Sequence, residues 1–417
     1  MRNYLIYLLY PLFIISCSLS GNSGEKDVID IEKGMADIKD IKVSEVFDRI
    51  SYIPLETSDS VLIGRYPRIF VTFDHILVSS HKQPLFVFDK KTGKYLNTVG
   101  HRGDDPLGYT DDGFGNLYYW VDSQSNIIYF LSNDSRNLLK FHVDGTFIGK
   151  VSLPNESNLY SSNVYIYHDT IWVYNKCIAD KKYPKLICFS GKTGELFGKE
   201  ESKKGLLPSY GEITDTNYLY GNQIGYGGNM HRYIYGKDRI YMFTPDASSF
   251  WRINDHLYFK EAFVDTIYSV SGSQTIPHKY INFGNWAWPY EERYMKNCSE
   301  NRLSVDYIYG NNNILFAHLT SGLYGMRDVR KEYIMVYFRK DGKTIISENN
   351  GLINDIDNSI DKFQIWGTTA NNEFYSCLSV NNFLEYRDKQ KIESSKGNLN
   401  SLQHVSPEDN PIIVFFQ

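Results

Sequence analysis

The sequence predicts an all-β protein, a six-bladed β-propeller, and three observations lead to this fold class. Tyr, Phe and Trp make up 15% of the 417 residues, whereas the chain contains only seven alanines. Aromatic side chains suit half-buried pleated strands, and a shortage of the best helix former disfavours helices. The other two observations are a degenerate repeat that occurs six times and the glycine-containing turns within it.

Each repeat begins with a polar residue and a spacer, followed by a run of apolar and aromatic residues. These first runs lie at Asp74–Val78, Ser125–Tyr129, Asp169–Val173, Asp238–Met242, Asn312–Phe316 and Asn372–Ser376. A second apolar run follows each of them, at Leu85–Phe88, Leu138–Phe141, Leu186–Phe189, Phe250–Ile253, Ile334–Phe338 and Phe383–Tyr386. In the last repeat, Phe383–Lys391 fits a short helix equally well. The paired runs predict one small antiparallel sheet per repeat.

Four of the second runs lead into a turn with glycine and then into another apolar segment. The turns are Lys91–Gly93, Asp144–Gly145, Lys192–Gly194 and Asp341–Gly342, and glycine accepts the positive φ that tight hairpins require. The anchors Ile76 and Phe374 lie 298 positions apart, so the mean period is about 60 residues. Small sheets cannot bury both faces alone, and stacking around a ring buries them. A two-sheet sandwich or a parallel β-helix explains six paired runs less well.

The N-terminus predicts export and lipid attachment. Arg2 precedes an apolar stretch of twelve residues, Tyr4–Ile15, which is shorter than the ~20 residues of a membrane-spanning helix. The following Ile14–Cys17 resembles the bacterial lipoprotein box. We therefore expect residues 1–17 to be a signal peptide ending at a lipid-modified Cys17, 18–40 a flexible tether and 41–417 the propeller. The alternative is an ordinary secretory signal with an incidental cysteine.

A lipid on Cys17 predicts a protein held at the cell envelope by its acyl chains. Ser18 follows the cysteine in place of the Asp that retains some lipoproteins in the inner membrane, which favours the outer membrane and leaves its periplasmic or surface face open. The remaining cysteines form no CxxC pair, so neither a zinc ribbon nor a thioredoxin-like redox site is expected. Cys177 and Cys188 flank a predicted hairpin and either pair or remain buried thiols.

Charge and motifs exclude several classes of function. The net charge is −5 without a long basic run, so no nucleic-acid partner is expected. The chain has no Gly-x-Ser-x-Gly elbow and no His-Glu-x-x-His helix. Asp355–Asp361 alternates oxygen-bearing side chains as a calcium loop does, but Ile360 and Trp366 stand where such a loop needs Gly and Glu. We expect neither a metal nor a cofactor.

Several segments resemble a large family of bacterial six-bladed β-propeller lipoproteins of unknown function, loosely linked to NHL-repeat propellers. They are Ser44–Thr57, Leu85–Asp89, Val99–Gly103, Tyr280–Gly284, Gly351–Asp357 and Glu408–Val414, and together they span nearly the whole mature chain. The resemblance implies that the last strand, Ile412–Phe416, completes a blade begun near the N-terminus, so that N- and C-terminal strands close the ring. The chain departs from the family at Asp104–Tyr109, which is more acidic and bulkier than the family's turn.

Two aromatic regions supply candidate ligand-binding residues. A segment rich in Tyr, Gly and Asn, 205–237, includes Tyr226 and Tyr233, and a second region contains Trp286, Trp288 and Tyr290. Long loops in compact domains are often functional, and exposed aromatic faces bind sugar rings or apolar peptides. The alternative is that these rings seal the gap between two blades. His101 and Arg102, which lie in a segment of the family resemblance, complete the candidate set.

We therefore expect a non-catalytic binding or scaffolding propeller, monomeric and held at the membrane by its lipid. It would recognise a glycan, a peptide or a partner protein through loops at one end of its channel. The competing hypothesis is a propeller enzyme of the lyase, glycosidase or lactonase type. Such an enzyme gathers carboxylates, histidines or a metal at the channel mouth from several blades, so linear spacing does not reveal the site.

Overall fold

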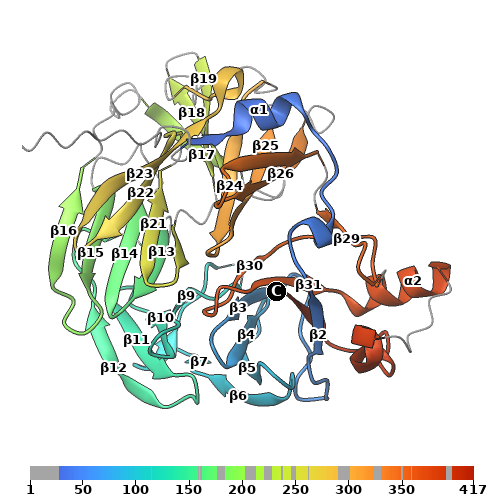
Figure 1. Ribbon diagram of the computed structural model, residues 1–417. Coiled ribbons are helices and arrows are strands. Elements are labelled where there is room, and N and C mark those ends of the chain that lie inside the picture. Colours follow the sequence, from blue (N-terminus) through green and yellow to red (C-terminus); the bar gives the residue numbers. More distant parts are fainter. Residues whose placement is uncertain are drawn as a thin grey trace, which may run out of the picture.

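The computed structural model describes residues 28–113, 115–157, 159, 162–175, 184–201, 213–219, 228–235, 238–245, 250–261, 263–289, 301–322, 330–348, 351–357, 359–390 and 397–417. Strands account for 49% of it and helices for 8%. Small antiparallel sheets follow one another along the chain and stand around a common axis (Figure 1). The predicted six-bladed β-propeller is confirmed.

The six blades are numbered here in chain order, and the strands of each are given from the innermost outward. Blades 1 to 3 consist of β3 (Arg68–Val71), β4 (His75–Ser79), β5 (Leu85–Asp89) and β6 (Tyr95–Val99); β9 (Tyr119–Asp122), β10 (Ile127–Leu131), β11 (Asn137–His142) and β12 (Phe147–Ser152); and β13 (Ser162–Tyr167), β14 (Thr170–Asn175), β15 (Leu186–Ser190) and β16 (Leu196–Glu200).

Blades 4 to 6 follow the same plan, with strands contributed by the N-terminal region to two of them. They consist of β20 (Phe250–Ile253), β21 (His256–Lys260), β22 (Thr266–Ser271), β23 (Gln274–Asn282) and β1 (Val28–Asp30); β24 (Ser304–Gly310), β25 (Ile314–Ser321), β26 (Lys331–Phe338) and β27 (Lys343–Ser347); and β30 (Gly367–Thr368), β31 (Phe374–Leu378), β32 (Ile412–Phe416) and β2 (Ile50–Pro54).

A separate cluster of buried apolar side chains fills each of the six interfaces between neighbouring blades. One aromatic residue of each cluster is named here, in order from the interface of blades 1 and 2 to that of blades 6 and 1: Phe130, Phe189, Phe259, Tyr337, Phe316 and Phe88. Each sheet thus buries both faces against its neighbours. Since the sixth cluster joins the last blade to the first, the sheets form a closed ring.

The ring is closed by strand exchange, as the family resemblance implied. The C-terminal strand β32 lies between β31 and the N-terminal strand β2, and Tyr52 is paired with Val414. The backbone amides of Asp48 and Arg49 also donate to the carbonyl of Gln417, at 2.8 and 3.0 Å. Blade 6 therefore contains both ends of the propeller, and its apolar residues are buried only when those ends meet.

The fourth predicted repeat is displaced from the blade that the structure shows. Its first run, Asp238–Met242, lies in β19 (Asp238–Pro245), which forms a separate three-stranded sheet with β17 (Ile213–Leu219) and β18 (Gly228–Tyr235). Blade 4 begins instead at Phe250, which packs directly against blade 3. The sequence pattern placed the fourth repeat wrongly because a hairpin outside the ring of blades has the same alternation of polar and apolar residues as a hairpin inside it. The segment predicted as a long loop, 205–237, contains β17 and β18.

The second run of the sixth repeat is helical. Phe383–Tyr386 lies in α2 (Val380–Gln390), which with the 3₁₀ helix η7 (Gly397–Leu402) connects β31 to β32. Phe383 is buried in the cluster between blades 5 and 6. The apolar residues of this run therefore cover the interface from a helix, which was the alternative considered for Phe383–Lys391.

The N-terminal strap, defined as Val28–Phe47, differs from the flexible tether expected over 18–40. Its strand β1 pairs in parallel with β23, and α1 (Ile31–Ala36) begins where the Asp30 carboxylate accepts from the amide of Lys33 at 3.1 Å. Ile29 and Ile31 are buried against blades 4 and 5. After the 3₁₀ helix η1 (Val43–Glu45) the chain enters blade 6, so the strap joins three consecutive blades.

The four predicted glycine turns connect the third and fourth strands of their blades, and each glycine has a positive φ. The values are 69° at Gly93, 89° at Gly145, 77° at Gly194 and 74° at Gly342. At Gly93 an added Cβ would also meet the Pro54 carbonyl oxygen at 2.0 Å. In blades 1 to 3 a bulge follows the turn, and such bulges disfavour pairing of an edge strand with another chain.

Ring closure predicts a large loss of stability for Phe416→Ala. The Phe416 side chain is 1% exposed, and its ring centroid lies 5.2 Å from those of Phe47 and Phe363. Truncation leaves a cavity where the two ends of the chain meet, so the free energy of unfolding in urea should fall by about 3–5 kcal/mol. Leu96→Ala, at an apolar side chain that is 48% exposed, is the control and should change it by less than about 0.5 kcal/mol. Equal losses for the two variants would contradict this account.

Candidate functional site

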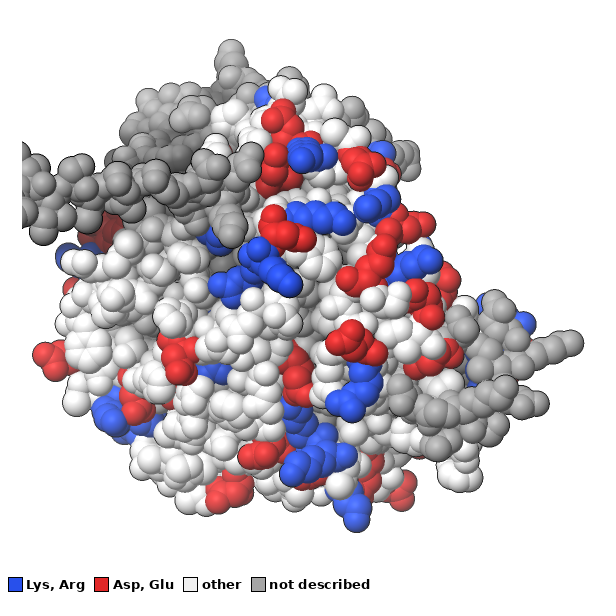
Figure 2. Space-filling model, in the orientation of Figure 1, with Lys and Arg blue, Asp and Glu red and all other residues white. Residues whose placement is uncertain are grey.

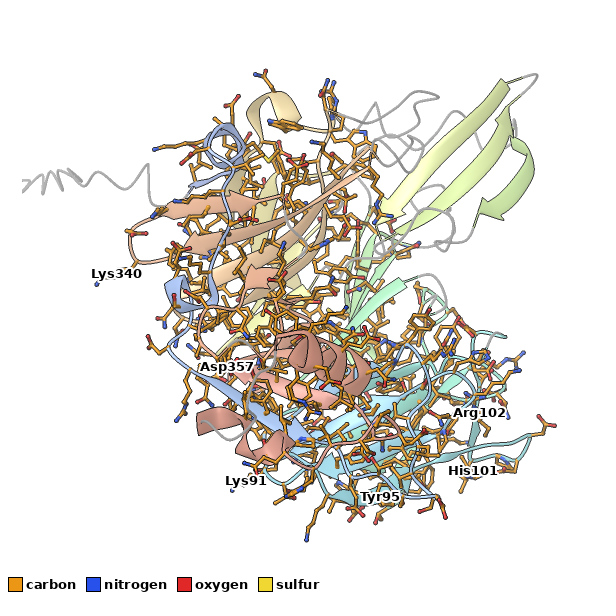
Figure 3. The ribbon with its side chains drawn as sticks, turned by 90° about the vertical axis from the view of Figure 1, so that its right-hand side faces the viewer. Lys91, Tyr95, His101, Arg102, Lys340 and Asp357 are labelled. Atoms are coloured by element: carbon orange, nitrogen blue, oxygen red, sulfur yellow. The ribbon has the colours of Figure 1, made fainter. Side chains whose placement is uncertain are left out.

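The two ends of the ring differ in the segments that they carry. Turns between the first and second strands, and between the third and fourth, lie at one end, which we call the short-turn face. The segments between blades, including β17–β19, lie at the other, the long-connection face. Figure 3 shows Lys91 and Lys340 at the short-turn side and His101 and Arg102 at the opposite side. Sequence-predicted His101 and Arg102 therefore belong to the long-connection face.

Three carboxamides tie blades 4, 5 and 6 together on the short-turn face. Asn254 Nδ2 donates to Asn312 Oδ1 at 2.6 Å, and Asn372 Nδ2 donates to Asn254 Oδ1 at 3.0 Å. These residues occupy the turn after the first strand of each blade. Charges of both signs are interspersed over this face, which is turned to the viewer in Figure 2. The short-turn face thus offers no strongly charged patch in the part that the structure describes.

Arginine and tyrosine side chains lie on the first and second strands of several blades, counted from the channel. Arg252 of β20 is buried, and its Nη2 donates to the carbonyl of Ala370 in blade 6 at 2.9 Å. The buried Tyr375 hydroxyl donates to the carbonyl of Ile69 in blade 1 at 2.8 Å, and burial raises the pKa of Tyr375, with a smaller contribution from Tyr119. Burial likewise raises the pKa of Tyr165 to about 12. Arg252 thus joins blade 4 to blade 6, and Tyr375 joins blade 6 to its neighbour, blade 1.

A group of basic side chains with one tyrosine among them lies on the long-connection face of blade 1 and of the connection between blades 1 and 2. We call it the basic rim and define it as Arg65, Tyr66, Arg68, His81, Lys82 and Arg102. Three segments contribute: the chain entering blade 1, the connection between β4 and β5, and the connection between blades 1 and 2. The last of these contains β7 (His101–Arg102), which pairs in parallel with β8 (Gly108–Tyr109).

Side chains and amides bond these segments to one another. Ser80 Oγ donates to the carbonyl of Arg65 at 2.8 Å. Gln83 accepts from the amide of Gly64 at 2.7 Å and donates to the carbonyl of Leu62 at 2.6 Å. The segment that enters blade 1 is therefore fastened to the connection that precedes β5.

Residues 115–117 link the rest of the basic rim. The carbonyl of Gly115 accepts from the amide of Lys82 at 2.9 Å and from Arg102 Nη2. The carbonyl of Leu117 accepts from Arg68 Nη1 at 2.9 Å, and the Arg68 guanidinium lies 5.3 Å from the ring centroid of Tyr119. Rim side chains from blade 1 and from the connection between blades 1 and 2 thus surround one short backbone segment.

Two non-glycine residues of the basic rim have a left-handed backbone. The φ angle is 57° at Tyr66 and 58° at Lys82. This conformation is unfavourable for side chains with a Cβ, by about 1 kcal/mol or more per residue, and such strain is concentrated at functional positions in proteins. The hydrogen bonds to Ser80, Gln83 and Gly115 hold the two segments in place against that cost.

Most cations of the basic rim have no acidic partner. Arg102 pairs with Asp111, its Nη1 lying 3.3 Å from the carboxylate oxygen. No carboxylate of the described residues lies within 4.0 Å of the side-chain nitrogens of Arg65, Arg68 or Lys82, and all three side chains are exposed. Nearby, His101 bonds Asp105 at 2.6 Å, and this hydrogen bond lowers the pKa of Asp105. The rim therefore presents positive charge to solvent.

The predicted tryptophans contact the core. Trp288 is 5% exposed and packs edge-on against Phe263, with ring centroids 5.1 Å apart. Trp286 ends the 3₁₀ helix η4 (Gly284–Trp286) and is partly buried against the cluster of blades 4 and 5. Their packing fits the alternative stated for them, a seal between two blades, and we do not include them in the candidate site.

Other predicted residues lie where the structure gives no side-chain description. Cys17, Cys177, Tyr226 and Tyr290 are outside the described residues, and Tyr233 is described only as part of strand β18. Cys188 is a buried thiol, and burial raises its pKa to about 11. Of the two alternatives stated for Cys188, a disulfide with Cys177 or a buried thiol, the structure has the free buried thiol.

Sequence reasoning missed most of the basic rim. Arg65–Arg68 and His81–Lys82 are short basic segments between apolar runs, and neither forms a motif with a known spacing. Only Arg102 belonged to the candidate set. Counting strands would have placed both segments on the face that carries Arg102, but their closeness depends on the hydrogen bonds to Gly115 and Leu117.

A second polar cluster lies on blade 5 near the same face. The buried Asp306 carboxylate accepts from Thr320 Oγ1 at 2.5 Å and lies 3.2 Å from His318 Nδ1. His318 Nε2 lies 4.0 Å from Glu332, which pairs with Arg330 at 2.8 Å. Within the described residues, no group of three or more His, Cys, Asp or Glu side chains has an arrangement that could hold a metal ion.

An ion network joins blades 3 and 4. Lys185 Nζ lies 2.7 Å from Glu200 and 3.1 Å from Glu261. The neighbouring Lys260 is 8% exposed, and its Nζ donates to the carbonyl of Glu261 at 3.2 Å. Burial lowers the pKa of Lys260 to about 8, and Asp265 and Glu261 oppose that shift. Lys185 is thus paired with two carboxylates, whereas the protonated form of Lys260 is destabilised by its burial.

Comparisons with known proteins agree with the fold. The family described as "Domain of unknown function (DUF4934)" matches residues 26–417, a range that includes the N-terminal strap and all six blades. A crystal structure of a Bacteroides fragilis protein classed as exported has a TM-score of 0.62 and 15% identity, covering 94% of this chain and 99% of its own. At that identity the similarity shows the fold alone.

A second solved structure, a member of the DUF4221 family from Bacteroides vulgatus, has a TM-score of 0.44 and 10% identity. It covers 89% of this chain and 96% of its own, and a similarity this low carries no argument. The comparison with curated proteins found no match.

The lowered pKa of Lys260 predicts a stability that depends on pH. The protonated amine disfavours the folded state, so the penalty is complete below pH 8 and fades as the pH rises toward the ordinary value of 10.5. Lys260→Met removes it, and after the loss of one hydrogen bond the free energy of unfolding at pH 7 should rise by roughly 2 kcal/mol. Urea unfolding from pH 7 to 10.5 measures this gain, which should disappear at the upper end. Lys199→Met, at an exposed lysine, should show no such trend.

Proposed function

Since the chain belongs to the DUF4934 family, whose function is unknown, we propose its role from its surface. It is a lipid-anchored cell-envelope propeller that binds a ligand, without catalysis, on the long-connection face. The ligand is a glycan, a peptide or a partner protein. The supporting observation is the contrast between the two ends of the ring: carboxamides tie blades together at one end, and exposed cations gather at the other.

The composition of the basic rim favours binding. Exposed guanidinium and ammonium groups and an open tyrosine ring supply contacts to a ligand. The segments that carry these groups are hydrogen-bonded to one another, so their backbone loses little conformational freedom when a ligand binds. Such preorganisation lowers the free-energy cost of association. The channel is a less suitable place because the buried Arg252 side chain links blade 4 to blade 6 there.

Export and lipid attachment at Cys17 are the second part of the proposal. The lipoprotein box supports them, and the similar fold of an exported protein agrees with an envelope location. No helix among the described residues is long and apolar enough to cross a membrane. Ten residues separate Cys17 from β1, and a chain of that length reaches at most about 35 Å. A lipid on Cys17 would therefore keep blade 4 near the bilayer.

The Asp306–His318 pair favours a second candidate function, that of a propeller enzyme. A buried carboxylate that orients a histidine is a common acid–base arrangement. Here Asp306 lies next to Nδ1 of the His318 imidazole, and Glu332 lies next to its Nε2. A hydrolase or lyase activity that is lost in His318→Gln and retained in His256→Gln, at an exposed turn of the opposite face, would favour the enzyme over the binding protein.

Lipid attachment predicts that Cys17→Ser releases the protein from the membrane. The wild-type chain, expressed with its own signal in a Gram-negative host, should sediment with outer-membrane vesicles, because its acyl chains hold it there. The Cys17→Ser variant should appear in the soluble envelope fraction, while Cys188→Ser, which alters a buried thiol, should stay with the membrane. A wild-type protein that is soluble, or whose N-terminal peptide has no added mass of acyl chains, would contradict the proposal.

Binding on the long-connection face can be tested by photo-crosslinking. A photoreactive amino acid replaces His101 in one variant and Lys91 in another, since both side chains are exposed and lie at opposite ends of the ring (Figure 3). In cells, crosslinking from position 101 should add the mass of a ligand to the protein, and crosslinking from position 91 should add none. Adducts from position 91 alone, or from neither position, would overturn the assignment of the face.

A further inference from the structure

We propose that the ligand of the basic rim is an acidic glycan, a polysaccharide with carboxylate or sulfate groups. This inference rests on the proposed function and adds the chemical class of its ligand. It is carried by three features that occur together: cations without acidic partners, an open aromatic ring among them, and a backbone that is already fixed in place.

The cations determine the sign of the ligand. Arg65, Arg68 and Lys82 are exposed, and within the described residues none has a carboxylate in ion-pair range. A guanidinium pairs with carboxylate or sulfate through two parallel hydrogen bonds, whereas an ammonium acts as a point charge. The three cations come from two segments joined by the bond between Ser80 and Arg65, so one flexible anionic chain can contact both segments.

Tyr66 favours a sugar over other anions. Its side chain is 81% exposed, more than any other large apolar or aromatic residue described, and it stands between Arg65 and Arg68 in the sequence. An exposed aromatic ring gives a broad contact area with few rotatable bonds and suits the apolar face of a sugar ring. A ring that is strained at its backbone and left in water is most simply explained by a ligand that covers it.

The surroundings disfavour the other anionic partners. Exposed Asp104 and Asp105 lie on the same connection as Arg102, and their carboxylates can accept hydrogen bonds from the hydroxyl groups that a glycan carries on every sugar unit. A peptide that binds by adding a strand needs free backbone groups on the protein. The backbone groups of the rim at Leu62, Arg65 and Lys82 are instead bonded within the protein.

The test uses the full chain purified in detergent and defined polymers as probes. Polygalacturonate carries carboxylates, dextran sulfate carries sulfates, and unmodified dextran is neutral. We expect at least one acidic glycan to bind and dextran to bind at least tenfold more weakly, with an affinity for the acidic glycan that falls as salt is added. Arg65→Gln/Lys82→Gln should weaken the binding about tenfold, since it removes two exposed charges that form no ion pair with the described residues.

Matched variants separate the rim from general charge effects. Lys91→Gln/Lys340→Gln removes the same charge from the short-turn face (Figure 3) and should leave affinity unchanged. Tyr66→Ala should weaken binding and Tyr66→Phe should not, because the ring is what contacts the sugar. Unchanged thermal unfolding shows that each variant is folded.

Several outcomes would overturn the inference. Equal effects of the rim and short-turn pairs would exclude the rim as the site. Binding of poly-glutamate or of phosphatidylglycerol vesicles that depends on Arg65 and Lys82, without binding of either acidic glycan, would assign the rim to a peptide or to the membrane. These results leave the proposed function intact if crosslinks still form from position 101; loss of those crosslinks would overturn both.

Discussion

The structure depends on one physical constraint: each small sheet has two apolar faces, and neither can remain in water. A blade buries one face against each neighbour, and six hydrophobic clusters, one per interface, satisfy all six blades only when the last meets the first. Blade 6 therefore combines β2 with β31 and β32, so that the two ends of the propeller are buried in one sheet. The N-terminal strap adds to this by covering the edges of blades 4 and 5 with β1 and α1.

Ring closure also decides where function can lie. Because every blade repeats the same strand directions, the turns after its first and third strands lie at one end, and the connection after its second strand lies at the other end with the segments between blades. The long segments are not needed for closure, and they are where this chain places its extra sheet β17–β19, its parallel pair β7–β8 and the cations of the basic rim. A rigid ring that presents variable connections on one face is a suitable support for a binding site.

The candidate site illustrates why linear patterns missed it. Arg65, Lys82 and Arg102 belong to three connections, and what brings them together is a set of backbone carbonyls, at Arg65, Gly115 and Leu117, that accept bonds from neighbouring segments. No spacing in the chain encodes those contacts. The tryptophans, by contrast, were conspicuous in the sequence, but Trp288 is buried against Phe263, and Trp286 packs against the cluster between blades 4 and 5.

The sequence by itself determined the class of fold and the number of blades, because alternating apolar runs, glycine turns and a period of about 60 residues are local or periodic properties. The closing strand was implied by the resemblance to a family of propeller lipoproteins. It could not decide which hairpin belongs to the ring. Asp238–Met242 and Phe250–Ile253 have the same character, and only packing of Phe250 against blade 3 makes the second a blade strand. Tertiary structure alone ordered the strap, made Phe383 part of a helix and gathered the basic rim, since each depends on contacts between residues far apart in the chain.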